Sequence, residues 1–169
     1  GHREVVELLC ESGADKNLRR QDGATALMFA SQRQDLDVVH LLCAYGADKD
    51  QTRQDGATAL MIASHLGTRG VVQLLCDAGA DKDQALQDGT TALMLASQRG
   101  HREVVELLCE SGADKDQTRQ DGATAMMLAS LKGHHDVVRV LYEAGARCFY
   151  HAGPVRAVCI PDAWYSILY

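Results

Sequence analysis

Short apolar runs separated by polar turns recur along this chain at an interval of 33 residues. The first run, DGATALM at Asp22–Met28, returns at Asp55–Met61, Asp88–Met94 and Asp121–Met127 with few changes. A second apolar run follows each of these, and in Val104–Leu108 it covers too wide an arc for one helix to bury alone. A fixed period of this length indicates stacked units in which each neighbour covers the apolar face of the next.

Each unit predicts a helix, a turn, a second helix and a projecting turn. A threonine precedes the first apolar run, where its hydroxyl can accept from a free backbone N–H; these residues are Thr25, Thr58, Thr91 and Thr124. Gly67, Gly100 and Gly133 then predict a left-handed helix end. Gln34 stands at this position in the first complete unit, where a left-handed conformation costs a residue other than glycine about 1–2 kcal/mol.

The recurring residues carry a family resemblance. The motifs G-x-T-x-L, A-S, G-H-x-E-V-V and L-L-x-x-G-A-D, together at this period, resemble the ankyrin repeat. The resemblance implies an all-α helix-turn-helix repeat solenoid with projecting β-turn or hairpin loops. We expect half a repeat in residues 1–21, repeats in 22–54, 55–87 and 88–120, a last repeat with an incomplete loop in 121–146, and a non-repeat tail in 147–169. Because the pattern starts in mid-repeat, we also expect sequence upstream of residue 1.

Net charge and apolar runs bear on the class of partner. The chain has 17 Lys and Arg against 23 Asp and Glu, a formal charge of −6, which disfavours binding to nucleic acid or to an anionic membrane surface. No apolar run approaches the roughly 18 residues of a membrane span, and no secretory pattern opens the chain. We therefore expect a monomer located in the cytoplasm, with the nucleus as an alternative, and no membrane partner.

The positions of the cysteines argue against disulfide bonds, and those of the histidines argue against a chemical role. Cys10, Cys43, Cys76 and Cys109 recur at one place in successive second helices, which stack about 8–10 Å apart, whereas a disulfide needs Cα atoms within about 7 Å. Small buried apolar side chains in a reducing compartment are the favoured interpretation. A structural capping role is favoured over a chemical one for the recurring histidines, which are His2, His101 and His134.

No catalytic constellation follows from the pattern, because catalysis requires different groups to converge at one place, and these groups recur singly along the stack. The pair Cys148 and His151 is a weak metal candidate, since no second pair at zinc-finger spacing follows it. We therefore expect no enzyme activity, no cofactor, no metal and no small-molecule substrate.

The resemblance implies a protein-protein interaction module, a scaffold or adaptor, that presents a concave surface of turn tips and first-helix residues. The corresponding turn positions here are Arg53, Gln54, Asp55, Ala57, Leu86, Gln87, Asp88, Thr90, Arg119, Gln120, Asp121 and Ala123. The corresponding first-helix positions are Gln32, Arg33, His65, Leu66, Gln98, Arg99, Leu131 and Lys132.

One unit differs from its sisters on this surface. His65 and Leu66 interrupt a polar Gln-Arg pattern, and Leu86 replaces a recurring arginine. These changes predict a small apolar notch near Ile62–Leu86, a suitable anchor because buried apolar side chains dominate interface energetics. Two alternatives remain open: a passive structural spacer, or a fragment of a larger multidomain protein whose catalytic or membrane part lies elsewhere.

The composition of the tail differs from that of the repeats. Both prolines and most of the aromatic residues lie at or after Tyr142, and charged residues become scarce after Arg147. One interpretation is a non-repeat cap in which Trp164 and its apolar neighbours cover the last repeat. The other is a disordered or artefactual end, which we favour because a cap of this family is expected to keep a polar outer helix.

Overall fold

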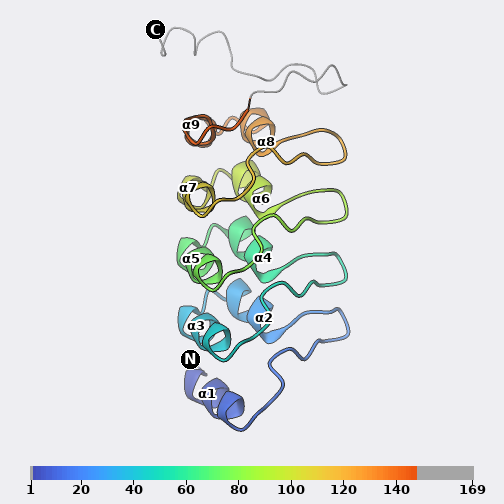
Figure 1. The fold of residues 1–169 in the computed structure, drawn as a ribbon, viewed down its shortest axis with the longest axis vertical. Helices are drawn as coiled ribbons and strands as arrows, with labels where there is room; N and C mark the ends of the chain where they lie inside the picture. The colour runs from blue at the N-terminus through green and yellow to red at the C-terminus, as the bar shows by residue number, and fades with distance from the viewer. Residues whose placement is uncertain (1, 148–169) are drawn as a thin grey trace, which may run out of the picture.

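The chain forms a stack of paired helices in the residues that the structure, a computed structural model, describes, 2–147 (Figure 1). These residues form nine helices: α1 (Arg3–Glu11), α2 (Ala26–Gln32), α3 (Leu36–Ala44), α4 (Ala59–Leu66), α5 (Arg69–Asp77), α6 (Ala92–Arg99), α7 (Arg102–Glu110), α8 (Ala125–Leu131) and α9 (His135–Glu143). The predicted helix-turn-helix solenoid is confirmed. The expectations for the tail after Arg147 lie outside the described residues.

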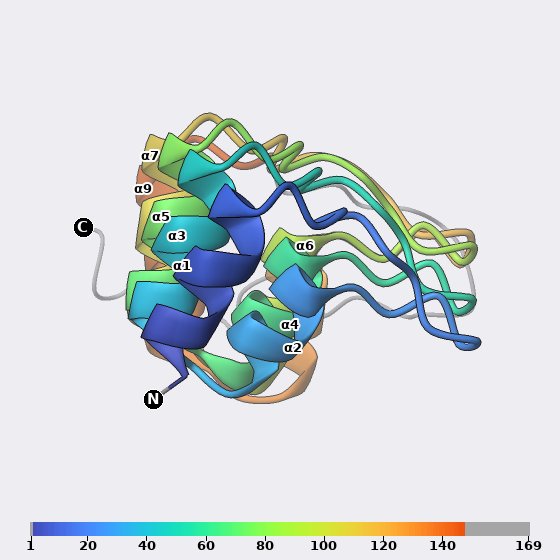
Figure 2. The ribbon, with the colours of Figure 1, turned by 90° about the horizontal axis from the view of Figure 1, so that it is seen from below.

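The helices form two rows along the long axis (Figures 1 and 2). The inner row contains α2, α4, α6 and α8, and the outer row contains α1, α3, α5, α7 and α9. Each inner helix packs against the outer helix that follows it in the chain and against the inner helices of the adjacent units. One helix pair therefore falls within each of the expected units from residue 22 onward, and α1 falls within residues 1–21.

The predicted threonine caps begin the inner helices. Thr58 Oγ1 accepts a hydrogen bond from the Met61 N–H at 3.3 Å, and the equivalent bonds at Thr25, Thr91 and Thr124 measure 3.3 or 3.4 Å. All four threonines are buried, so each hydroxyl satisfies a backbone donor that water cannot reach. The caps therefore fix where each inner helix begins inside the core.

Small and medium-sized apolar side chains fill the space between the rows. In the unit of α4 and α5, Leu60, Met61, Val72 and Leu75 are each at most 2% exposed. Complete burial of one such side chain contributes about 1.5–3 kcal/mol. The same positions recur in every unit, so the core is a continuous column of Leu, Val, Ala and Met, which accounts for the low aromatic content.

Identical sequences at different places in the stack show what the neighbours contribute. Helices α1 and α7 share the sequence REVVELLCE. Leu107 is 4% exposed in α7, which packs against α5, α6 and α9, whereas its counterpart Leu8 in α1 is 66% exposed. Burial of the outer helices thus depends on adjacent helices and not on their own sequence.

Hydrogen bonds also join successive units along their connecting segments. A side-chain oxygen in one unit accepts from a backbone N–H in the next: Asn17 from Asp48, Asp50 from Asp81, Asp83 from Asp114, and Asp116 from Arg147, at 2.7–2.8 Å. The acidic side chains of these segments therefore help to hold successive units together.

The projecting loops are tight turns. The Gly56 N–H donates to the Arg53 carbonyl and the Arg53 N–H donates to the Ala57 carbonyl, both at 2.9 Å, with Gly56 at a φ of +84°. The predicted β-turns are therefore present. The hairpin character is slight, because the only strand-like pairing within 2–147 is an isolated antiparallel bridge between Ala85 and Thr91.

Gln34 has a φ of 59° and is the only residue other than glycine with a positive φ in the described part of the chain. We expect Gln34→Gly to raise the free energy of unfolding by about 1 kcal/mol, because it removes a left-handed strain that Gly67 avoids in the next unit. Gln32→Gly, at the last residue of α2, serves as the control and is expected to lower it by about 0.5 kcal/mol. Chemical denaturation measures both, and an unchanged or lower value for Gln34→Gly would contradict the expectation.

Candidate binding surface

The turns project away from the helices, so that the turns and the inner row border an open concave face (Figure 2). Leu66, Arg99, Leu131 and Lys132 lie exposed at the ends of the inner helices, and Gln54 lies exposed on a turn. Two predicted contact residues contribute little surface: Thr90 and Ala123 are each 5% exposed. Their backbone N–H groups donate to the aspartates two residues earlier, as does that of the half-buried Ala57.

A concavity of about 460 Å³ lies where the sequence predicts an apolar notch. It brings together seven of the predicted contact residues, which are Gln32, Arg53, Asp55, Ala57, His65, Leu66 and Leu86. Met61, Ile62 and Leu95 complete the lining, and we refer to this concavity as the notch. Leu95 lies one repeat after Ile62, and this periodicity is the signal that could have identified it.

Leu86 gives the notch its apolar side. It packs against the neighbouring turn, since a Cβ added at Gly56 would lie 3.5 Å from the Leu86 Cδ2. The sister turns have an arginine at this position, and two of these fold back on their own turn: Arg53 Nε donates to Asp55, and Arg119 Nε donates to Asp121, at 3.1 and 3.2 Å, whereas Arg20 lies over the Phe29 ring. Leu86 makes no such bond and leaves its side chain to the notch.

The arginine-aspartate pairs neutralise two of the turns. The hydrogen bond from Arg53 is the main cause that holds the pKa of Asp55 below its usual value, and Arg119 does the same for Asp121. In the turn of Leu86, the pKa of Asp88 is also lowered, but chiefly by hydrogen bonds from Thr90. The turn of Leu86 therefore lacks the internal ion pair that the turns of Arg53 and Arg119 have.

The turns are bonded to one another in two pairs. The Gln54 N–H donates to the Asp22 carbonyl at 3.0 Å, and the Gln120 N–H donates to the Asp88 carbonyl at 2.9 Å. Within residues 2–147, no equivalent backbone bond joins the turn of Asp55 to the turn of Gln87. The notch lies at this break between the two pairs.

His65 forms the polar edge of the notch. Its Nε2 lies 3.0 Å from the Arg99 Nη2, and because a guanidinium only donates, this nitrogen is the acceptor of a neutral imidazole. Burial, followed by the charges of Arg99 and His101, lowers the pKa of His65 below 6.5. A neutral His65 therefore faces the notch at physiological pH.

A second concavity, of about 480 Å³, lies further along the stack. It is lined by Gln98, Arg99, Lys132 and His134. Arg99 borders this hollow and also contacts His65 in the notch, so one guanidinium connects the two. Lys132, like Arg33 at the end of α2, makes no ion pair with any described residue.

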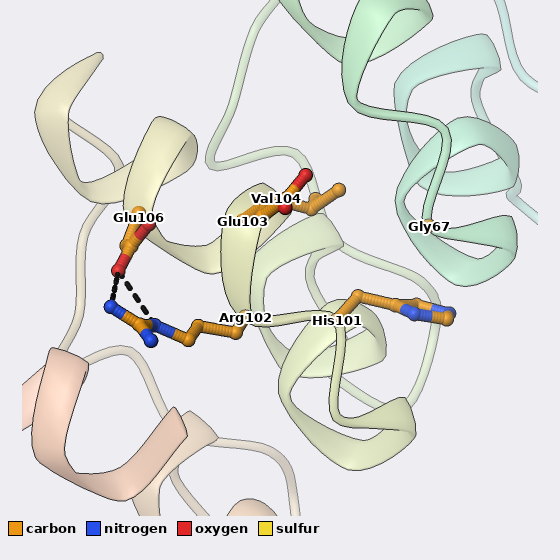
Figure 3. Close-up of a pocket in the computed structure, with 6 residues that line it drawn as sticks. All are labelled: Gly67, His101, Arg102, Glu103, Val104 and Glu106. Carbon is orange, nitrogen blue, oxygen red and sulfur yellow. Dashed lines mark hydrogen bonds and ion pairs between the residues drawn. The ribbon is translucent and has the colours of Figure 1, made fainter. Parts of the chain in front are cut away.

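A third hollow, of about 500 Å³, lies beside α7 and contains none of the predicted contact residues (Figure 3). The His101 ring extends toward Gly67, and Arg102 pairs with Glu106 at 2.8 Å. His101 Nε2 lies 3.0 Å from the His65 carbonyl, and His134 bonds the Gln98 carbonyl in the same way. His101 and His134 thus have a structural role, in which they join successive units, but the capping role that we predicted is wrong because neither side chain caps its own helix.

The remaining titratable groups give no sign of catalysis. Cys10, Cys43, Cys76 and Cys109 are free thiols, and burial raises the pKa of Cys109 to about 11, which disfavours the nucleophilic thiolate. Among residues 2–147, no three His, Cys, Asp or Glu side chains are grouped to hold a metal ion. The candidate pair Cys148 and His151 lies outside the described residues. None of the helices in this part of the chain combines the length and apolar content needed to cross a membrane.

The Gly67 position tests the bond between units. We expect Gly67→Ala to lower the free energy of unfolding by about 1 kcal/mol more than Gly79→Ala, because a Cβ at residue 67 would lie 2.5 Å from the His101 ring and displace its hydrogen bond. Gly79 is the matched control, since its φ is also positive but nothing lies within 4 Å. Equal losses in chemical denaturation would show that the His101 bond contributes nothing.

The neutral His65 predicts a pH dependence. Because its pKa is lowered by folding, the unfolded chain binds more protons as pH falls, so the contribution of His65 to stability is present above pH 6.5 and is lost as pH falls through the folded pKa. Replacement by Gln, the residue of the sister units, removes this term. We expect the difference in unfolding free energy between wild type and His65→Gln to shift by a few tenths of a kcal/mol below pH 6.5. A difference that stays constant with pH would contradict the lowered pKa of His65.

Comparison with known families agrees with this architecture. The family described as ankyrin repeats (3 copies) matches residues 1–85 and 65–150 of the chain, which together cover most of its length. No curated protein matches the chain. Ankyrin repeats are generally protein-protein interaction modules and are typically non-catalytic. With the helix pairs, the projecting turns and the bonds between units all in place, this chain belongs to the ankyrin repeat family.

Proposed function

We propose that the chain is a scaffold or adaptor module that holds a segment of a partner protein on its concave face, with the notch as the anchor. The observation that carries the proposal is the notch itself. The repeats differ on this face at His65, Leu66 and Leu86, and the structure brings these three residues together around one concavity.

The chemistry of the notch suits an anchor. Leu66 is 40% exposed, and it shares the concavity with Ile62 and Leu95 from two adjacent inner helices. Removal of such surface from water is the main source of binding energy at an interface centre, and the polar Gln32 and His65 at the edge resemble the rim of such a site. Leu66 is exposed at a position where the sister units have Arg33, Arg99 and Lys132, and an exposed leucine there gives no advantage to folding.

The second candidate is a passive spacer, which the near-identity of the remaining turns favours. The turns at Arg53 and Arg119 have the same sequence, Arg-Gln-Asp-Gly-Ala, and the same internal ion pairs. A spacer needs no difference between units on its concave face. The notch is the feature by which the two functions can be distinguished.

The variant His65→Gln, Leu66→Arg, Leu86→Arg restores the residues of the sister units. We expect it to fold with an unfolding free energy within about 1 kcal/mol of wild type, because sister units carry these residues at surface positions. We expect it to lose at least about tenfold in affinity for any protein captured by wild type, since the apolar anchor is replaced by charge. Affinity capture from the native cell followed by titration of the captured protein measures this loss.

A matched control carries the same added charge elsewhere. Leu18→Arg, Leu36→Arg introduces two arginines at residues that are 70% and 47% exposed and that do not line the notch. We expect this control to keep wild-type affinity. Identical capture by wild type, the restored variant and the control would favour the spacer and overturn the proposal.

A further inference from the structure

Charge is distributed unevenly around the stack. The inner helices α2, α4, α6 and α8 contain no aspartate or glutamate. The outer helices carry all the helical carboxylates of the described residues, as in Glu103, Glu106 and Glu110 of α7, and the connecting segments add the aspartates that join the units. The inner helices thus add no negative charge to the concave face, and the carboxylate that the turns bring to the notch, Asp55, is paired with Arg53.

Positive charge borders the notch on this face. Arg99 approaches His65, and the lowered pKa of that ring means that the guanidinium faces a neutral acceptor and no carboxylate. Lys132 lies with Arg99 around the next hollow. By contrast, the turn arginines Arg53 and Arg119 are paired with their own aspartates, Asp55 and Asp121. Arg99 and Lys132 therefore have charge available for a bound molecule.

On the basis of the function proposed above, we infer that the partner segment is acidic and carries one large apolar side chain. The apolar side chain enters the notch between Leu66 and Leu86. Carboxylates that follow it along the stack meet Arg99 and Lys132, where a guanidinium can bind a carboxylate through two parallel hydrogen bonds. The remote carboxylates of the outer face repel the same segment and help to confine it to the concave side.

An acidic protein segment fits these residues better than nucleic acid does, although both are anions. Recognition of a phosphate backbone requires many cations along its path, and the net charge of −6 opposes it. In the notch, Ile62, Leu66, Leu86 and Leu95 lie beside the polar lining residues and suit an aliphatic or aromatic side chain. A peptide provides both groups within a few residues.

A random peptide library displayed on phage, selected on the whole wild-type chain and counter-selected on the restored variant His65→Gln, Leu66→Arg, Leu86→Arg, tests the inference. We expect the selected peptides to share one large apolar residue flanked by aspartate or glutamate. Their affinities, measured by fluorescence anisotropy with synthetic peptides, should fall about tenfold as ionic strength rises from low to high. They should also fall about tenfold in Arg99→Gln, Lys132→Gln.

The control is Arg69→Gln, Arg139→Gln, which removes the same charge from the outer helices and should leave these affinities unchanged. Selected peptides that are neutral or basic, or that bind equally to both double variants, would overturn the acidic partner while the notch remains an anchor. Competition by a single-stranded oligothymidine at wild-type affinity would overturn it in favour of nucleic acid. If no selected peptide distinguishes wild type from the restored variant, the proposed function fails together with this inference.

Discussion

The structure depends on one constraint: no unit of this chain can bury its own apolar face. The identical helices α1 and α7 show how much burial adjacent helices supply: Leu8 is 66% exposed in α1, which has no inner helix of its own unit among the described residues, and Leu107 is 4% exposed in α7, which packs against α5, α6 and α9. Stability in such a stack is a sum of contributions from units and from the interfaces between them. Each residue that faces a neighbour must therefore suit nearly the same surroundings in every unit.

That constraint makes residues that hold the stack together repeat from unit to unit, whereas residues that could recognise a partner can differ. The cap at Thr58, the left-handed Gly67 and the buried core repeat because the contact between units repeats. Side chains that point away from the neighbouring units escape this requirement. Differences among the units are therefore most informative on the concave face, where Leu66 is exposed and Leu86 lines the notch while it also packs against the turn of Gly56.

Much of the fold could be predicted from the sequence because it depends on local rules repeated many times. The threonine caps and the positive φ of Gln34 follow from residue type and period alone. The position of the notch could also be predicted, from three departures in one unit. The contact of Arg99 with His65 could not, because it depends on side-chain conformation across units. The burial of Thr90 could not be predicted either, because the equivalent Ala57 makes the same turn hydrogen bond and is half-buried.

The two bonded pairs of turns have a consequence for what the notch can hold. Within residues 2–147 no backbone hydrogen bond joins the turn of Asp55 to the turn of Gln87, and the bonds between these two units lie in the connecting segments, where Asp81 and Gln84 donate to Asp50. Beneath the turns, the floor of the notch is formed by the tightly packed α4 and α6. The opening is therefore bounded by side-chain contacts, such as that of Leu86 with the turn of Gly56, so a wider side chain displaces less van der Waals contact at the opening than at the floor.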